Sequence, residues 1–272
     1  LSGSVFGFDL AALGVSPEPI GGSFALDASA SAAGKGAYAA RIALDSIEIR
    51  NKHRTDRIRP TSVSLHTDSA ATRAEAASGD LSLTFSTPQS ADSLIAALTR
   101  SARALAGQID AQSIDMEQLK PALPDFALRV SAGPDNILNS LLKSRKIAFD
   151  ALNAEGANCD SLPVSIRLRT EGLAYGNVVL DTVTADIRQN GKRLEYALGL
   201  ANAPGNLDNI ARAGLYGHLV RNTGQANLYQ RNRAGREGFR FGLDVTWTDS
   251  LVRASVTPPD PLFGFEPWTV NR

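Results

Sequence analysis

The chain has very few of the residue types on which many enzymes and metal proteins depend. Its 272 residues include one cysteine, Cys159, and three histidines, His53, His66 and His218. A single cysteine excludes an internal disulfide and a zinc site built from thiolates. None of the histidines has a second histidine or an aspartate at metal-ligand spacing, so we expect them to be polar surface residues. We therefore predict no bound metal and no cofactor.

Net charge and long apolar runs are also lacking. The 28 basic residues balance the 28 acidic ones, so nothing in the composition predicts a nucleic-acid partner or attraction to an anionic surface. No apolar run approaches the roughly 18 residues of a membrane-spanning helix. The first residues, Leu1–Ser4, do not have the pattern of a signal peptide, and the end, Trp268–Arg272, falls in a predicted strand. We expect a piece of a longer protein, with any anchor outside it.

Strict alternation of apolar and polar residues is the main pattern in the sequence, and its longest stretch runs from Leu162 to Ala201. Three runs in this stretch each alternate with a period of two, and Asn190-Gly191 separates the second run from the third. Side chains of a strand point to opposite faces in turn, and Asn-Gly is a strong hairpin signal. The stretch therefore predicts antiparallel strands with one apolar face and one polar face, with a further turn at Gly172–Gly176.

Similar alternation occupies most of the remaining chain. The Phe239–Trp247 run is the most regular of all. In the run Tyr38–Arg50 the apolar set changes phase at Asp45-Ser46, which predicts a β-bulge.

One insert breaks the pattern. Between Ser90 and Ile109 apolar residues recur every three or four positions, which indicates a helix whose apolar stripe packs on the sheet. Ser90 suits its N-cap and Gly107 its end. We expect a second short helix over Ser113–Lys120 and a third starting near Pro134.

These patterns together predict a mainly β fold. We expect one long, curled, antiparallel-rich sheet with a short helical insert at about 90–145. Three segments follow: an N-terminal β segment over 1–88, a helical insert with one strand over 89–145, and a β segment over 146–272.

No arrangement of residues indicates catalysis. The carboxylates are isolated along polar strand faces, and Gly235–Gly238 and Gly214–Gly217 do not open a helix after a buried strand, as phosphate loops do. We predict that the chain is not an enzyme.

Several stretches resemble a known family. They are Leu123–Val130 with the Asn136-containing helix after it, Gly205–Gly217, Asn227–Tyr229, Phe239–Trp247 and Phe265–Asn271. Together they are similar to the TamB-type translocation and assembly module proteins in the version found in Bacteroidota. That family is related to the AsmA-like and bridge-like lipid transfer proteins.

The resemblance implies a β-taco, a curled sheet with an open apolar groove, in a periplasmic protein anchored in the inner membrane by a segment outside this chain. It implies a role in phospholipid transport and outer-membrane protein assembly. The implied partners are phospholipid acyl chains and an outer-membrane barrel of the Omp85 type.

The candidate groove lining is the apolar set of four predicted strands: Val164, Ile166, Leu168, Val179, Val183, Ile187, Leu194, Tyr196, Leu198, Phe239, Phe241, Leu243 and Val245. The same alternation also fits the core of a closed β-sandwich. The alternative function is accordingly a sandwich-type binding module of an exported or surface protein, of the glycan or adhesin type.

Overall fold

The structure is a computed structural model, and it describes residues 1–9, 11–12, 14, 21–34, 36–50, 55–143, 145–159, 162–202, 210–248, 250–257 and 260–269. His53 and the end of the predicted C-terminal strand, 270–272, lie outside these residues.

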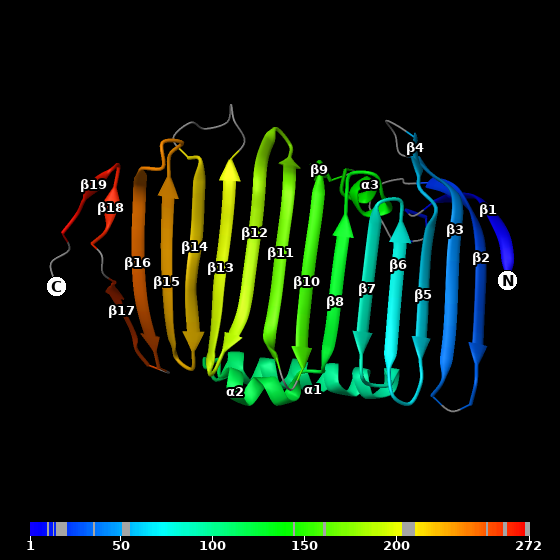
Figure 1. Cartoon of the computed structure of the whole chain (residues 1–272), viewed down its shortest axis with the longest axis horizontal. Helices are drawn as coiled ribbons and strands as arrows, with labels where there is room; N and C mark the ends of the chain where they lie inside the picture. The colour runs from blue at the N-terminus through cyan, green and yellow to red at the C-terminus, as the bar shows by residue number, and fades with distance from the viewer. Residues whose placement is uncertain are drawn as a thin grey trace.

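The fold is mainly β, as predicted, and the strands of the described residues all belong to one antiparallel sheet that does not close into a barrel (Figure 1). The strands are β1 Ser2–Asp9, β2 Gly21–Ala32, β3 Tyr38–Arg50, β4 Thr55–Ile58, β5 Thr61–Thr67, β6 Thr72–Ser78, β7 Leu81–Thr87, β8 Phe126–Ala132, β9 Ile147–Ala148, β10 Ala151–Cys159, β11 Leu162–Tyr175, β12 Val178–Asn190, β13 Arg193–Asn202, β14 Arg212–Val220, β15 Thr223–Arg231, β16 Glu237–Trp247, β17 Val252–Val256, β18 Leu262–Phe263 and β19 Glu266–Pro267.

The sheet is an up-and-down meander in which nearly every long strand pairs with the next one along the chain. The helical insert does not interrupt it, because β7 pairs with β8 and β8 pairs with β10. The short strands are additions to this order: β4 pairs with β3, β9 with β11, and both β17 and β18 with β16. A closed sandwich needs two apposed sheets, whereas these strands form one.

The insert forms α1 Ala91–Asp110, α2 Met116–Leu119, the 3-10 helix η1 Lys120–Ala122 and α3 Ile137–Lys143. The Ser90 side chain accepts a hydrogen bond from the Ser93 N–H, so the predicted N-cap is confirmed. The predicted end at Gly107 is wrong. Helical bonding continues past it, with the Ala111 N–H donating to the Gly107 carbonyl.

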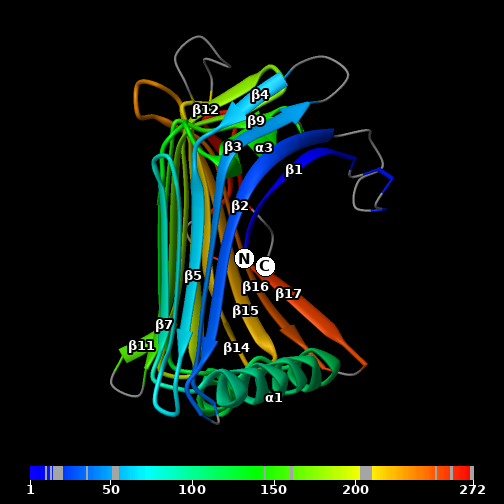
Figure 2. The same cartoon turned by 90° about the vertical axis from the view of Figure 1, so that its right-hand side faces the viewer.

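The sheet is thin and curled, with α1 lying inside the curve at one end of the strands (Figure 2). The upper ends of β2 and β3 bend toward the same side in that view. The accessible surface is 16846 Å². A compact monomer of 28.8 kDa is expected to expose only about 11,300 Å². The excess is what a single layer with both faces open to water produces.

The prediction that the apolar stripe of α1 packs on the sheet is wrong. Ala97 is the buried residue of this helix, and its neighbour Ser101 donates to the Ala122 carbonyl of η1. Ile95 and Ile109 are 63% and 59% exposed. Small side chains face the packed side because α1 is held close against η1, which leaves the large apolar side chains of the stripe in solvent.

The predicted bulge in β3 is confirmed. Ser23 pairs with Glu48, but Ala25 pairs with Asp45, so β3 contains one extra residue there, and Ser46 has a positive φ of 51°. The Asn-Gly hairpin also forms, shifted by one position. Asn190 pairs with Arg193, which leaves Gly191 and Lys192 as the two-residue loop.

Two predicted boundaries differ. The turn proposed at Gly172–Gly176 begins only at Gly176, because β11 continues through Gly172 to Tyr175; Gly172 takes a positive φ of 61° within the strand. At the C-terminus the described part of the predicted strand, Trp268 and Thr269, is not in a strand, and β19 ends before it at Pro267. The chain is tied there by the Trp268 N–H, which donates to the Pro261 carbonyl.

Candidate functional site

An unbroken line of apolar residues crosses twelve consecutive strands of the sheet on one face. Each residue is the direct cross-strand partner of the next, and direct partners point to the same side. In order from β3 to β16 the line is Ile42, Val63, Ala76, Leu83, Val130, Ala154, Leu168, Ala185, Leu198, Leu215, Leu228 and Phe241. We call the face that carries it the apolar face.

A parallel line two residues along each strand has the same character. It contains Leu65, Phe85, Leu128, Ile166, Ile187, Tyr196 and Leu243, with alanine or glycine at its other positions as far as β16. The apolar face is therefore a continuous surface, at least two residues wide, along almost the whole sheet.

Large side chains on the apolar face remain in contact with solvent. Ile42, Val63, Leu198 and Leu228 are each 42–44% exposed, although they lie in the interior of their strands. In the part of the chain that the structure describes, no second sheet lies over them. A monomer rarely leaves so long an apolar surface exposed unless the surface binds something.

The helical insert covers this face at one end of the strands only. Met116 and Leu119 of α2 are 2% and 7% exposed and pack on Val164, which is 8% exposed, with Leu194 beside it. Since Val164 and Leu194 project to the apolar face, α2 lies on that face. Helices α1 and α2 lie along the lower strand ends in Figure 1.

The connection between α1 and α2 is tied to the sheet by polar contacts. Asp115 caps α2 by accepting from the Glu117 N–H, and it accepts a second hydrogen bond from Arg221 Nε at 3.2 Å. Burial opposes ionisation of Asp115, but the hydrogen bonds from Arg221 and from nearby backbone N–H groups outweigh it, so the pKa of the carboxyl lies below its ordinary 3.8. Trp247 Nε1 also donates to the Gln112 carbonyl.

The N-terminal end of α1 is held by two buried threonines. The hydroxyls of Thr67 and Thr72 lie 2.8 Å apart, and Thr72 donates to the Gln89 carbonyl. The Ala91 N–H, one of the free donors at the helix start, donates to the Thr67 hydroxyl at 3.0 Å. The insert is thus fixed to strands near both ends of the sheet and bridges the curve between them.

Twelve of the thirteen residues predicted to line a groove lie on the apolar face. Val164, Ile166, Leu168, Val183, Ile187, Leu194, Tyr196, Leu198, Phe239, Phe241, Leu243 and Val245 share the phase of the two lines described above. Val179 lies beyond a register shift between Leu180 and Thr182, close to the β11–β12 turn, and does not continue these lines. Within the set, Val164 and Leu194 lie beneath α2.

Tyr196 lies flat along the sheet. Its hydroxyl donates to the Gln225 carbonyl at 2.9 Å, and burial raises the pKa of the phenol. It passes over Gly217, where a Cβ would lie only 2.7 Å from the Tyr196 oxygen.

Sequence reasoning missed the N-terminal half of the apolar face. Ile42, Val63, Leu83 and Val130 belong to alternating runs that predict strands, so the local signal is present in the sequence. What it did not reveal was that these strands are continuous with β11–β16.

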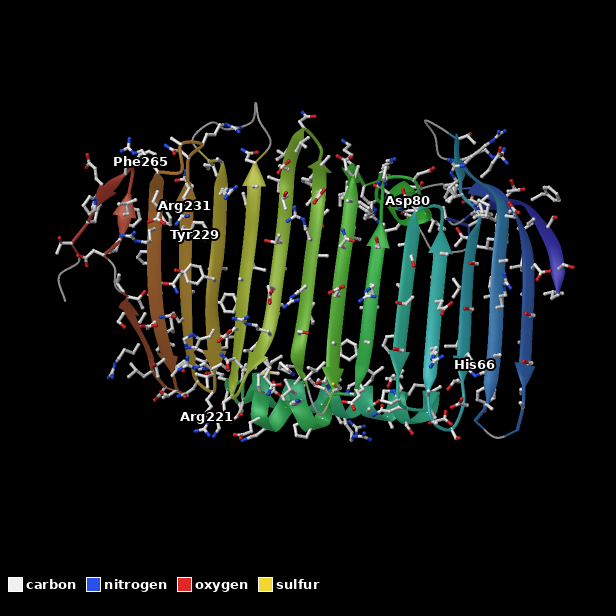
Figure 3. All side chains as sticks on the ribbon, viewed as in Figure 1. His66, Asp80, Arg221, Tyr229, Arg231 and Phe265 are labelled. Atoms are coloured by element: carbon white, nitrogen blue, oxygen red, sulfur yellow. The ribbon has the colours of Figure 1, made fainter. Side chains whose placement is uncertain are left out.

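The opposite face is polar, and we call it the polar face. Its corresponding line includes Arg129, Glu155, Arg167 and Asp186, which are successive cross-strand partners of alternating charge. Arg129 and Glu155 are 3.3 Å apart, and Arg167 and Asp186 are 3.4 Å apart. Such exposed pairs contribute little stability each, but their charges show that this face of the sheet is polar. Figure 3 looks onto it.

No helix among the described residues is long and apolar enough to cross a membrane. Within the same residues, no three His, Cys, Asp or Glu side chains come together as metal ligands would. Comparison with family models, with curated proteins and with solved structures found no match to the chain.

Proposed function

We propose that the apolar face binds phospholipid acyl chains and that the chain is part of a periplasmic envelope-biogenesis protein of the TamB type. The observation that carries the proposal is the unbroken apolar line from Ile42 to Phe241, with large side chains left more than 40% exposed. No chemical step is required, because the ligand only exchanges water for an apolar surface.

The energetics favour such a ligand. Transfer of an acyl chain from water contributes about 0.8 kcal/mol for each methylene that is buried. The exposed faces of Leu198 and Leu228 gain as well, since they leave water in the same event. A polar ligand would lose its hydration on this face without gaining hydrogen bonds.

The length of the apolar face suits a path along which lipid moves better than it suits a single binding pocket. Twelve strands spaced by roughly 4.8 Å extend over about 50 Å. One leaflet of a bilayer contributes about 15 Å of hydrocarbon thickness. Several acyl chains therefore fit end to end, which is consistent with movement of phospholipid along the sheet between membranes. Outer-membrane assembly with an Omp85-type barrel belongs to the same proposal.

Photo-crosslinking tests the proposal with matched positions on the two faces. We would place p-benzoylphenylalanine at Ile166 or Leu228 on the apolar face, and at the adjacent Arg167 or Asn227 on the polar face. Each variant is mixed with phosphatidylethanolamine vesicles, irradiated and analysed by mass spectrometry. We expect lipid adducts at Ile166 and Leu228 and at least about tenfold less at the adjacent positions.

Equal labelling of the two faces, or no labelling of either face in variants that keep their β circular dichroism, would refute acyl-chain binding by the apolar face.

A further inference from the structure

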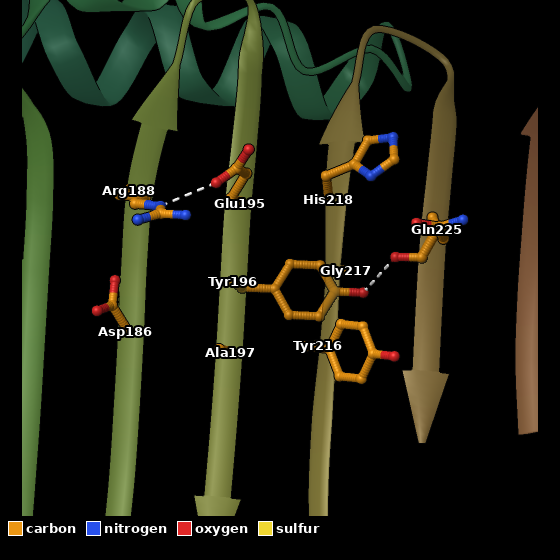
Figure 4. Close-up of a pocket in the computed structure, with 9 residues that line it drawn as sticks. All are labelled: Asp186, Arg188, Glu195, Tyr196, Ala197, Tyr216, Gly217, His218 and Gln225. Carbon is orange, nitrogen blue, oxygen red and sulfur yellow. Dashed lines mark hydrogen bonds and ion pairs between the residues drawn. The ribbon is translucent and has the colours of Figure 1, made fainter. Parts of the chain in front are cut away.

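The polar face is hollowed around Tyr216, on the opposite side of the sheet from the proposed lipid groove. One hollow of about 450 Å³ lies between this ring and Arg188, Glu195 and His218. A second, of about 640 Å³, lies between it and Tyr229, Arg231 and Glu237. Figure 4 shows the first of them, with Tyr216 at its border. Both volumes are in the range of small-molecule sites.

Small residues make the floor of the larger hollow. Gly199 and Gly242 line it, and Gly214, the cross-strand partner of Gly199 on β14, lies beneath the Tyr229 ring. A Cβ at Gly214 would lie 2.6 Å from Tyr229 Cε1, and one at Gly199 would lie 2.8 Å from Thr184 Oγ1. Larger residues would therefore fill the hollow or displace the side chains that border it.

Two tyrosine rings form one wall. Tyr216 is 50% exposed, and its ring centre lies 6.2 Å from that of Tyr229, with an angle of 55° between the two ring planes. The Arg231 guanidinium lies 5.4 Å from the centre of the Tyr229 ring. Figure 3 labels Tyr229 and Arg231 on this face. The Tyr216 ring thus offers a half-exposed aromatic surface beside the ring of Tyr229.

The charged groups around the two hollows are paired with one another. Glu237 binds both Arg231, at 3.1 Å, and Arg240, at 2.6 Å. Arg188 and Glu195 are 2.8 Å apart. Among the residues that line the hollows, three arginines accompany two glutamates and Asp186, and Asp186 is also paired with Arg167. A site with balanced charges gives no net attraction to an anion, but it offers many hydrogen-bond donors and acceptors.

We propose that this hollow binds an uncharged oligosaccharide. Sugar rings present C–H groups that pack on the negative face of an aromatic ring such as Tyr216. Their hydroxyls can hydrogen-bond to paired carboxylate, guanidinium and amide groups without requiring a net charge. The two hollows on either side of one ring suit consecutive sugar units of a chain. The inference does not depend on lipid binding, since the two sites occupy opposite faces.

Calorimetric titration of the whole chain tests this proposal. The probes are maltohexaose, cellotetraose and N-acetylchitotetraose, with a heparin-derived tetrasaccharide as the charged comparator. We expect at least one neutral probe to bind with a dissociation constant on the order of 1 mM, and the heparin fragment to bind more weakly. Tyr216→Ala should weaken binding roughly tenfold, whereas Tyr216→Phe should keep it within about threefold.

Tyr175→Ala is the matched control, because Tyr175 is 68% exposed but lies at the end of β11, outside both hollows. It should leave the affinity unchanged. Failure of all three neutral probes to bind at about 10 mM, preference for the heparin fragment, or equal loss in Tyr175→Ala and Tyr216→Ala would each overturn the proposal. Strand circular dichroism of every variant confirms that the comparison is made between folded proteins.

Discussion

At the scale of single residues, the position of a side chain in the strand period decides its role. Ala197 and Leu198 are neighbours in β13, yet Leu198 belongs to the apolar line and Ala197 to the polar face. Asp115 has two roles at the insert, because one carboxylate both caps α2 and binds Arg221 of the β14–β15 turn.

Asp115 gives the docking of the insert a defined pH dependence. Its pKa is lower in the folded chain than in the unfolded chain. The stability that it provides is therefore complete above the unfolded pKa of about 3.9 and is lost as the pH falls through the lower folded value. We expect Trp247 fluorescence to report release of the insert in this acidic window, since Trp247 Nε1 donates to Gln112.

Asp115→Asn should lower the melting temperature at pH 7 and remove part of this acid transition. Glu117→Gln is the control, because Glu117 pairs with Lys192 where both side chains are at least half exposed. If the two variants showed the same acid transition as the unaltered chain, Asp115 would not be the group that fixes the insert.

At the scale of elements, α1 shows where sequence reasoning succeeds and where it stops. The three- and four-residue spacing identified the helix and Ser90 its start, because both signals are local. The spacing could not tell which side of the helix packs. Ala97 faces inward and Ile95 outward because the contacts of η1 and the strand ends decide this, and those contacts are distant in sequence.

The strands illustrate the same limit. The alternating runs predicted nearly all of them, and their phase alone put twelve of the thirteen candidate residues on one face. The register that aligns Leu83 with Val130 across the whole insert depends on a pairing between β7 and β8, which no local pattern specifies. For this reason the N-terminal half of the apolar face was not assigned to the site.

The threonine contact at the start of α1 predicts how firmly the insert is attached. Thr67→Val keeps the shape of a side chain that is 1% exposed but removes the acceptor for the Ala91 N–H and the partner of Thr72. Leaving such buried groups unsatisfied costs about 1–3 kcal/mol, which urea unfolding would measure. Thr84→Val, at an exposed position on β7, should change the free energy of unfolding by less than about 0.5 kcal/mol. Equal losses of unfolding free energy in Thr67→Val and Thr84→Val would show that the Thr67 contact does not hold the start of α1.

At the scale of the whole molecule, the defining property is an accessible surface larger than that of a compact monomer of the same mass. A compact chain of this length has a radius of gyration of about 18–19 Å. We expect solution scattering to give a distinctly larger radius, about 23–26 Å, because a sheet of some fifteen strands at roughly 4.8 Å spacing is about 70 Å long. A radius near 19 Å would show that the sheet closes on itself in solution.

Lipid retention tests the central claim, an open apolar face that binds acyl chains, most directly. The chain would be incubated with vesicles of phosphatidylethanolamine and phosphatidylglycerol, re-isolated and analysed by native mass spectrometry. We predict bound phospholipid on the unaltered chain and on Ala197→Glu, and its loss in Leu198→Glu, which remains folded because Leu198 is 44% exposed. No lipid on the unaltered chain, or equal retention by the two variants, would contradict the account.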